Sequence, residues 1–246
     1  MKPRMLIAGD DRTRAIACAE AAGFEVVERN PAVVLCHGGD GTLLRAERMW
    51  PEIPKIPARL GKGAQLCEQH SLDSILDRYR RDELECSKLE MLQCSLGESR
   101  FFALNDVVLR NDNPALALRF RLFVDDVELG SETTGDGVVL ATPFGSTGYY
   151  HTLTRQRFEE GIGIAFNNCT RAALPPVVLD SSRVVRVDVT RGPGVLTHDN
   201  DRRTVHLRQG HRFEISRAER VATVHGLDAL ACQTCFRYDA ETFNPH

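Results

Sequence analysis

The residues best suited to chemistry lie in one short segment, GGDGT, at positions 38–42. An apolar run precedes this segment, and a pattern typical of a helix follows it. Glycines allow backbone N–H groups to approach a phosphate because no Cβ stands in the way, and the N-terminus of a helix favours an anion through its dipole. The segment therefore predicts a phosphate-binding loop, whose backbone is shaped by Gly38, Gly39, Gly41 and Thr42.

Asp40 lies inside this loop, where a carboxylate would repel a bound phosphate. Two functions explain its presence. It either binds Mg²⁺, which bridges carboxylate and phosphate oxygens, or accepts the proton of an attacking hydroxyl. The segment is neither a P-loop, because it lacks Gly-Lys-Ser/Thr, nor a GxGxxG dinucleotide fingerprint. The alternative is a tight turn in which Asp40 caps the helix that follows.

Two further polar segments accompany the loop. Asn105 and Asp106 begin an apolar strand, and the segment 133–150 combines an Asp-Gly pair, an apolar strand and a glycine-rich turn. Each feature alone has an ordinary structural explanation: a solvated strand entry, a hairpin turn at Asp136–Gly137, and a helix cap at Ser146–Thr147. These separate explanations account poorly for the occurrence of all the features in this order and spacing.

The elements that must position these segments fall into two regions. Alternating short strands and helices in the first region predict an α/β N-terminal domain with a parallel sheet, over residues 1–92. From about Glu85 onward, strand patterns separated by turn signals predict a β-rich, β-sandwich-like domain over 93–230, followed by a C-terminal tail at 231–246. The expected strands of the first domain are 5–10, 25–28, 32–38 and 54–61, and its expected helices are 11–24, 42–50 and 70–82.

The composition is that of an ordinary globular protein. Of 246 residues, 42% are hydrophobic and 26% charged, and the net charge of −3 comes without a basic stripe, so we expect no nucleic-acid partner. The N-terminal apolar run, MLIA, is too short for a signal peptide, and no later run reaches membrane-spanning length. We therefore expect a cytoplasmic protein with no membrane partner.

The eight cysteines are expected to be mostly reduced thiols in that compartment. Only Cys232 and Cys235 form a CxxC motif, and one such pair cannot complete a four-ligand zinc site. His225, Cys86 or Cys94 are candidates to complete it in space, although their spacing does not indicate it. The favoured interpretation is two packed thiols near the C-terminus, and no metal ligand is assigned.

The combination of motifs resembles the NAD kinase family. The resemblance rests on GGDGT (38–42), on Asn-Asp followed by an apolar strand (105–109), and on DGVVLATPFGSTGY (136–149). GGDGT by itself is shared with diacylglycerol and sphingosine kinases, which lack the other two motifs in this form. The resemblance implies an NAD kinase-like two-domain fold and phosphorylation of a ribose hydroxyl of NAD to give NADP. It also implies ATP or polyphosphate as donor, Mg²⁺ as cofactor, and a homodimer or homotetramer.

The resemblance further implies roles for individual residues. Asp40 matches the aspartate proposed in the family as the general base or magnesium-linked catalytic group, and the rest of its loop surrounds the phosphates. The residues matched to nucleotide and substrate binding are Asn105 and Asp106 on the adenine side, Asp136 on the nicotinamide side, and Thr147, Gly148 and Tyr149 in the substrate pocket.

Part of the substrate wall departs from the family pattern. Thr152 stands where the family has serine, and the Gly-Gly-Pro that usually follows is absent. Asn167 and Asn168 end an apolar strand, where a buried amide needs a hydrogen-bond partner and an exposed turn is the alternative, so Asn168 joins the substrate-binding candidates. Further polar side chains near these positions, for which a surface or turn position is favoured, are His151, Arg155, Arg157 and Asp199.

Three functions therefore stay open. The first is an ATP-dependent NAD kinase. The second is a kinase of the same fold that acts on another hydroxyl acceptor (a sugar, nucleoside or polyol), which the changes at 148–158 and 167–168 favour and the Asn105–Asp106 pair disfavours. The third is a nucleotide-binding module without catalysis, which the complete GGDGT segment disfavours. Each of the three has a small-molecule partner.

Overall fold

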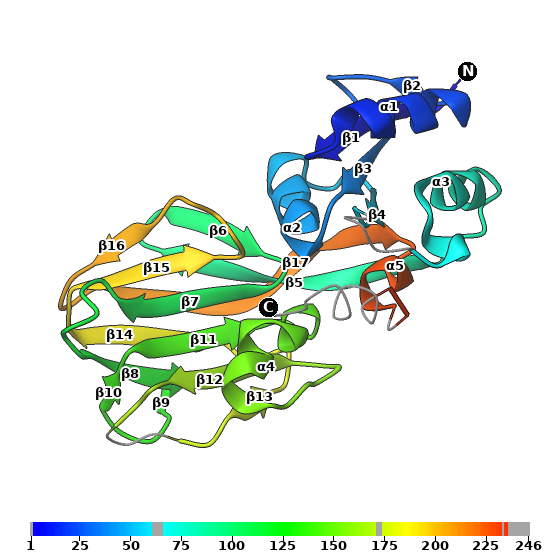
Figure 1. Ribbon diagram of the computed structural model, residues 1–246. Coiled ribbons are helices and arrows are strands. Elements are labelled where there is room, and N and C mark those ends of the chain that lie inside the picture. Colours follow the sequence, from blue (N-terminus) through cyan, green and yellow to red (C-terminus); the bar gives the residue numbers. More distant parts are fainter. Residues whose placement is uncertain (1, 61–65, 171–173, 233, 236–246) are drawn as a thin grey trace, which may run out of the picture. The chain divides into compact units, whose positions relative to one another are not determined.

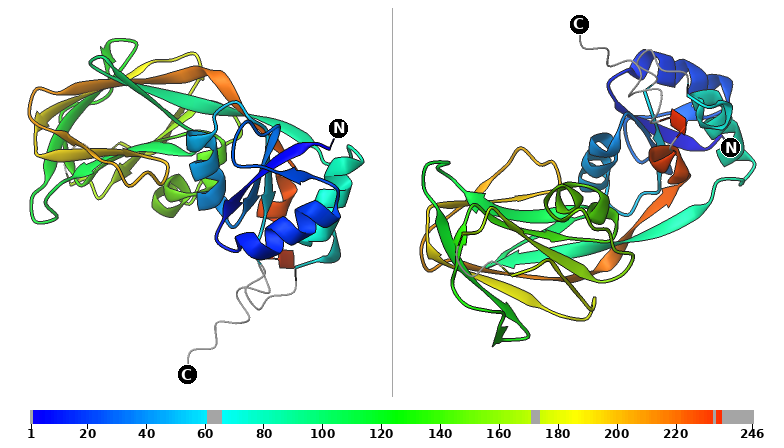
Figure 2. Two further views of the ribbon diagram at one scale, coloured as in Figure 1. Left: turned by 90° about the horizontal axis from the view of Figure 1, so that it is seen from above. Right: turned by 60° about the horizontal axis from the view of Figure 1, so that its bottom comes forward.

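The computed structural model describes residues 2–60, 66–170, 174–232 and 234–235. The chain forms two compact units, one of residues 1–89 and 222–246 and the other of residues 90–221. Strands β5 (Cys86–Leu96) and β17 (Arg212–His225) pair with each other, and each begins in one unit and ends in the other (Figure 2). The division differs from the one expected at 92/93 and 230/231, because the chain returns to the first unit at residue 222.

The first unit contains the expected parallel sheet. Its strands β1 (Arg4–Gly9), β2 (Glu25–Val26), β3 (Val33–His37) and β4 (Lys55–Ala58) follow the order β4-β3-β1-β2. All of these neighbours are parallel, and the end of β17 joins β4 in parallel through Val224 and Lys55. The apolar runs that predicted β1, β3 and β4 are buried on both faces, as is usual for a parallel sheet between helices.

Helices cover both faces of this sheet (Figure 1). Helices α1 (Arg12–Ala21) and α3 (Leu72–Arg80) pack on one face, in a core that also contains Met5, Ile7 and Leu35. Helix α2 (Asp40–Met49) contacts β3 and β4 through Leu43, Leu44 and Ala46. The short helices η1 (Glu68–His70) and α5 (Asp228–Ala231) complete the unit. Within the described residues, no helix combines the length and apolarity needed to cross a bilayer.

The second unit is built from antiparallel strands in two layers. One layer has the order β10-β8-β14-β17, with β9 beside β8 and the hairpin β5–β6 beside β17. The other has the order β13-β12-β11-β7-β15-β16. The bounds are β6 Ser99–Ala103, β7 Asp106–Asn111, β8 Leu118–Val124, β9 Val127–Glu128, β10 Thr133–Gly135, β11 Gly137–Ala141, β12 Ile162–Asn167, β13 Val177–Leu179, β14 Val185–Arg191, β15 Gly194–His198 and β16 Val205–Leu207.

The two layers share one apolar core, which confirms the expected β-sandwich-like architecture. Val107 and Leu109 of β7 face this core together with Phe120 of β8 and Val187 of β14. Val108, between them in sequence, faces the opposite side, because side chains alternate along a strand. On that side the sheet is covered by Tyr150 of helix α4 (Tyr149–Thr154), which contacts β11 and β12 (Figure 1).

Three local predictions are wrong. The strand pattern over residues 100–111 predicts one strand, but these residues form β6 and β7 with a break at Leu104–Asn105. The patterns over 212–217 and 221–227 predict two strands, but residues 212–225 form the single strand β17. Asp136–Gly137 is no hairpin turn, because β10 pairs with β8 in one layer whereas β11 pairs with β7 and β12 in the other. The chain changes layer at Gly137, where φ is +146° and a Cβ would lie 1.9 Å from the carbonyl oxygen of Leu109.

Candidate functional site

The GGDGT loop lies at the carboxyl edge of the parallel sheet. Strand β3 ends at His37, and α2 begins at Asp40 with Gly39 as its N-cap. Gly9, His37 and Ala58 are neighbours at the ends of β1, β3 and β4, so the loops that follow these three strands share one edge. Ligands of open α/β sheets bind at this edge. The predicted phosphate loop therefore stands where the fold favours a ligand.

The two glycines before α2 differ in what the fold requires of them. A Cβ on Gly38 would lie 2.2 Å from Oγ1 of Thr42 and 3.0 Å from its Cβ, so the chain itself needs a glycine there. A Cβ on Gly39 would meet no atom within 4 Å. Its φ of −102° and ψ of −167° are open to any residue. Packing within the described chain therefore does not explain the glycine at position 39.

Asp40 is the first residue of α2 and is exposed. Its carboxylate accepts no hydrogen bond from the described residues, so the alternative of a side-chain cap is not realised. The partial loss of solvent around the side chain raises the pKa of Asp40, and the charge of Arg59 opposes that rise. The carboxylate thus stays open to a ligand while one cation of the same unit acts on it.

Sequence reasoning missed Arg59, which follows β4 directly and so stands at the same sheet edge. Its Nη2 donates a hydrogen bond of 2.9 Å to the carbonyl oxygen of Leu230 in α5. The sequence does contain a signal for Arg59, because it directly follows the apolar run that forms β4. Residues that follow parallel strands meet at one edge of the sheet, so Arg59 could have been predicted near the GGDGT loop.

A buried ion pair fixes α2 to the sheet. Lys55 of β4, which is fully buried, donates to the carboxylate of Glu47 and to the carbonyl oxygen of Trp50, the latter at 2.8 Å. Removing one partner of a buried pair leaves an uncompensated charge and costs about 3–5 kcal/mol. The pair therefore holds the helix that carries Asp40 in place.

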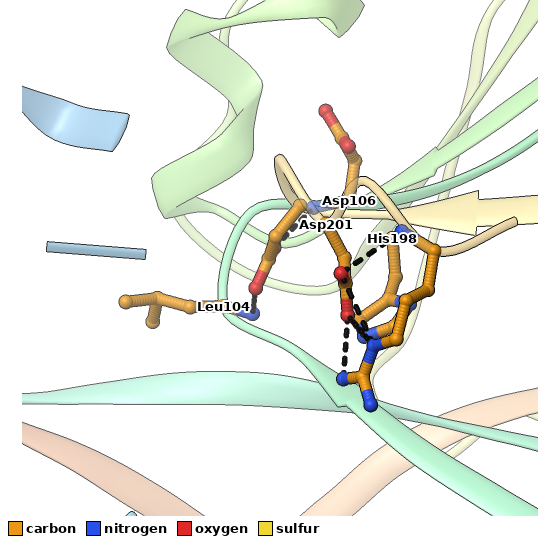
Figure 3. Close-up of polar contacts among 6 residues, drawn as sticks. Leu104, Asp106, His198 and Asp201 are labelled. Atoms are coloured by element: carbon orange, nitrogen blue, oxygen red, sulfur yellow. Dashed lines mark hydrogen bonds and ion pairs between the residues drawn. The ribbon is translucent and has the colours of Figure 1, made fainter. Parts of the chain in front are cut away.

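A second polar cluster lies in the β-rich unit, where β6 gives way to β7. The carboxylate of Asp199 accepts hydrogen bonds from three consecutive backbone N–H groups, those of Leu104 at 3.1 Å, Asn105 at 2.7 Å and Asp106 at 3.4 Å. Figure 3 shows Leu104 and Asp106 on this turn beside His198 and Asp201. Asp199, expected first as a turn residue, therefore also shapes the segment that carries the Asn-Asp motif.

Asp106 is buried, with 4% of its surface exposed, and accepts a hydrogen bond of 2.9 Å from Nδ2 of Asn105. Burial, together with the nearby charge of Asp199, raises the pKa of Asp106 to about 7, and the Asn105 hydrogen bond opposes this rise. The side chain of Asn105, half-buried, is oriented by the same bond.

The glycine-rich turn of the third motif packs on Asn105. A Cβ on Gly145 would lie 1.9 Å from the carbonyl oxygen of Asn105, and one on Gly148 would lie 3.1 Å from Nδ2 of the same residue. The hydroxyl of Thr142 donates to the carbonyl oxygen of Leu104 at 2.6 Å. The structure thus brings together the predicted residues Asn105, Asp106 and Gly148, with Thr147 and Tyr149 on either side of Gly148.

Asp136 and Asn168 lie elsewhere in this unit. Asp136 accepts hydrogen bonds from Nδ2 of Asn111 at 3.3 Å and from Nδ2 of Asn168 at 3.0 Å. Asp106 begins β7 and Asn111 ends it. The cluster around Asp106 and the cluster around Asp136 are therefore separated by the length of that strand, about 17 Å. Asn168, exposed and at a φ of 46°, matches the expected turn after β12.

The remaining polar candidates have partners around α4. The hydroxyl of Thr152 donates to the carbonyl oxygen of Gly148 at 3.3 Å, and Nδ1 of His151 lies 3.2 Å from the carbonyl oxygen of Gln156. Arg155 ends α4 in the left-handed conformation, and Arg157 is exposed, so both have the expected surface position.

The CxxC motif is not completed by the residues that the sequence suggested. Cys94 is buried in the core of the other unit, Cys86 is exposed, and His225 packs edge-on against Tyr79. Cys232 and Cys235 instead lie beside Cys67 and His70. The predicted tail continues beyond them into residues 236–246, which lie outside the described residues, as do Gly61 and Gly63 of the segment after β4.

Comparisons with known proteins agree with the motifs. No family model matches the chain. The NAD kinase of Hydrogenovibrio crunogenus is 31% identical over 205 residues, which cover 75% of this chain and 69% of that protein. This chain belongs to the NAD kinase family. Two other members, from Methanopyrus kandleri and Methanothermobacter thermautotrophicus, are 32% and 31% identical over 166 and 177 residues. The matches cover 64% and 69% of this chain, and the chain spans 59% and 62% of those two relatives.

Solved structures show the same fold. Yeast NADH kinase, solved in complex with NADH, matches with a TM-score of 0.76 and 17% identity over 100% of this chain and 89% of that chain. An NAD kinase from Archaeoglobus fulgidus, solved in complex with ATP, matches with a TM-score of 0.75 and 20% identity over 95% of this chain and 97% of that chain. The α/β region followed by a β-rich region is therefore the NAD kinase fold.

Proposed function

We propose that this protein transfers a phosphoryl group from ATP to a ribose hydroxyl of NAD, giving NADP. The observation that carries the proposal is the environment of Asp40, an exposed carboxylate at the N-terminus of α2, on the ligand-binding edge of a parallel sheet. Membership of the NAD kinase family supports the same activity.

The backbone before Asp40 suits a phosphate. The packing of the chain does not require a glycine at position 39, since a Cβ there would meet no atom within 4 Å. A ligand that occupies the space of this Cβ would explain the glycine. The N-terminus of α2 presents the positive end of the helix dipole to that space. Gly38, Gly39, Gly41 and Thr42 are accordingly assigned to phosphate binding.

Asp40 is assigned as the general base that takes the proton of the acceptor hydroxyl. Phosphoryl transfer asks a protein mainly for positioning and charge neutralisation, and a base within hydrogen-bond reach assists the attack. The raised pKa of Asp40 brings the carboxylate closer to the basicity that such a role needs, and Arg59 keeps it from rising further. The positive charge of the same arginine would also attract the phosphates.

The residues present also fit Mg²⁺. Asp40 is an exposed carboxylate with no hydrogen bond to other described residues, and Mg²⁺ is usually held by one or two carboxylates together with substrate phosphates and water. Asp40 would hold the ion, which when bound would neutralise charge on the phosphoryl group being transferred.

The nucleotide is assigned to the cluster around Asn105 in the β-rich unit. Asn105 offers a carboxamide oriented by Asp106, and the turn at Gly148 leaves room beside it. The solved relatives contain NADH in one case and ATP in the other, which are the ligand types this assignment expects. Thr147, Tyr149 and Thr152 are assigned to the same substrate pocket. The roles of Asp136 and Asn168 in substrate binding stay predictions, and a homodimer or homotetramer is expected from the family.

The experiment is an acceptor panel with the purified protein. Mg·ATP is supplied with NAD, NADH, sugars, nucleosides or polyols in turn, ADP release is measured, and the product is identified by mass. We expect NAD to be converted to NADP. Asp40→Asn should lower the turnover rate about 10²–10⁴-fold, which is the usual contribution of a general base to the rate. The matched control is Asp73→Asn, which removes an exposed acid from the first turn of α3.

Each outcome separates the candidate functions. ADP release with a sugar, nucleoside or polyol and none with NAD would replace the proposal by a kinase for another acceptor. No turnover with any acceptor, together with measurable NAD binding, would indicate a nucleotide-binding module. Unchanged turnover in Asp40→Asn would remove the assigned base.

A further inference from the structure

Two separate segments of the α/β unit bring four metal-binding side chains together. Cys67 and His70 stand three residues apart just before α3, and Cys232 and Cys235 stand three residues apart just after α5. One ligand atom from each of the four lies within 4.8 Å of all the others. Only the second pair was predicted from the sequence as a candidate metal-binding pair, because the first is a Cys-x-x-His motif some 165 residues away from it.

Three distances within this cluster are close to the edges of a tetrahedron around one ion, and the fourth, between Sγ of Cys67 and Nδ1 of His70, is shorter at 2.9 Å. Sγ of Cys67 lies 3.8 Å from Sγ of Cys232 and 3.5 Å from Sγ of Cys235, and Sγ of Cys235 lies 3.7 Å from Nδ1 of His70. Zinc bonds of about 2.3 Å to sulfur and 2.0–2.1 Å to nitrogen imply edges of about 3.8 Å between sulfurs and about 3.6 Å between sulfur and nitrogen. The sulfurs are too far apart for a disulfide, whose bond is about 2.05 Å.

The histidine of the cluster is oriented as a ligand. His70 is buried, with 2% of its surface exposed, and its Nδ1 lies 2.9 Å from Sγ of Cys67. Its other nitrogen, Nε2, lies 3.0 Å from Oδ2 of Asp228 in α5. A carboxylate on the second nitrogen is the usual outer partner of a metal-bound histidine, because it fixes the ring and directs the free lone pair to the metal.

We propose that Cys67, His70, Cys232 and Cys235 form a structural zinc site. Three thiolates and one imidazole select zinc among the common divalent ions, and four protein ligands leave no open position for a substrate. Binding converts the three thiols to thiolates and releases their protons. The site joins the C-terminal segment to the segment that leads into α3, independently of whether the protein is an NAD kinase.

The site has a structural connection to the Asp40 region. Leu230 lies in α5 between Asp228 and Cys232, and its carbonyl oxygen accepts the hydrogen bond from Arg59. The ion would therefore hold the carbonyl group that orients the arginine acting on Asp40.

The first test is the metal content of the protein, expressed with zinc and purified under reducing conditions without chelator. We expect about one zinc ion per chain, released on titration of the thiols with a mercurial. Cobalt reconstitution should give the intense visible bands of a tetrahedral ion and a thiolate-to-cobalt charge-transfer band. A protein that binds neither metal while folded and reduced, or that carries a disulfide between two of these cysteines, overturns the proposal.

Variants identify the ligands. Cys67→Ser and Cys235→Ser should lose the metal, whereas Cys86→Ser, at an exposed cysteine outside the cluster, should keep it. His70→Cys should keep zinc and change the cobalt spectrum to that of four thiolates. This variant still decides the matter if the serine variants fail to fold. Full zinc occupancy and an unchanged cobalt spectrum in the Cys67→Ser and His70→Cys variants would contradict the assignment.

Asp228→Asn tests the outer partner. We expect zinc affinity to fall about 10–100-fold in competition with a chromophoric chelator, the usual effect of losing such a carboxylate. An unchanged affinity would show that Asp228 does not orient His70.

Discussion

At the residue scale, the proposed chemistry depends on the carboxylate of Asp40, whose pKa is set by two opposing effects. Loss of solvent raises the pKa of Asp40, and the charge of Arg59 opposes that rise. Arg59 is itself held by the carbonyl oxygen of Leu230. The basicity of Asp40 therefore depends on a residue that follows the neighbouring strand, and no motif search would include that residue.

Asp106 gives a pH-dependent prediction for stability. Its pKa rises from 3.8 to about 7 on folding, so the folded protein keeps a proton that the unfolded chain has lost. Stability should therefore fall as pH rises through this window, with a slope of at most about 1.4 kcal/mol per pH unit, and level off above it. Asp106→Asn cannot ionise and should escape this loss.

The measurement is urea unfolding of both proteins, without ligand, at several pH values. Asp106→Asn should match the parent protein near the lower pKa and exceed it increasingly up to about pH 7. Asp82→Asn, at an exposed position, controls for the substitution itself. A difference between Asp106→Asn and its parent that does not vary with pH would refute the assignment of the shift to this residue.

At the element scale, the loop before α2 makes a prediction about its two glycines. Gly38→Ala should destabilise the protein by about 1–3 kcal/mol, because the added methyl meets Thr42. Gly39→Ala should leave stability within about 0.5 kcal/mol, because its space is open and its backbone angles are ordinary. It should nevertheless weaken ATP binding, because the methyl group takes the space proposed for a phosphate.

Thermal unfolding and ATP titration, both made on each variant, check this contrast. Gly38→Ala combined with Thr42→Ala, which removes the crowding hydroxyl of residue 42, should recover part of the lost stability. ATP binding by Gly39→Ala equal to that of the parent would show that no phosphate lies against this residue.

The sequence predicted the elements well where one pattern dominates. The buried strands β1, β3 and β4 and the helices between them follow directly from apolar runs and from breaks such as Gly23 and Pro51. The break between β6 and β7 could not be predicted, because it is made by a contact with Asp199, some 95 residues away. The change of layer at Asp136–Gly137 was missed for a similar reason, since an Asp-Gly pair is equally typical of a hairpin.

The same limit applies to the candidate site. Motif matching found Asn105, Asp106 and Gly148, which the fold brings together, and also Asp136, which it places at the other end of β7. A resemblance of motifs shows the order of the residues along the chain, but it does not show the distances between them in the folded protein. Arg59 belongs to no motif, and the Cys-x-x-His pair of Cys67 and His70 lies far in sequence from Cys232 and Cys235. Only the folded chain brings these residues to their partners.

At the scale of the whole molecule, the α/β unit is made from two separate stretches of chain. The second stretch supplies the strand end at Val224, which pairs with Lys55, and Ala229, which is buried in the core of the unit. The β-rich unit is continuous, and the described residues of its main core all lie between Leu92 and Ile215.

The two halves of this protein therefore differ in how well they should survive separation. A gene fragment encoding 90–221 should yield a product that melts cooperatively in calorimetry, whereas one encoding 1–89 should not, unless residues 222–246 are spliced on through a short linker. Cooperative melting of the bare 1–89 product would contradict this. A stop codon shortly before position 222 should prevent the α/β unit from folding, although residues 1–89 of that unit have already been translated. The unit cannot complete its fold until the ribosome has also translated residues 222–246.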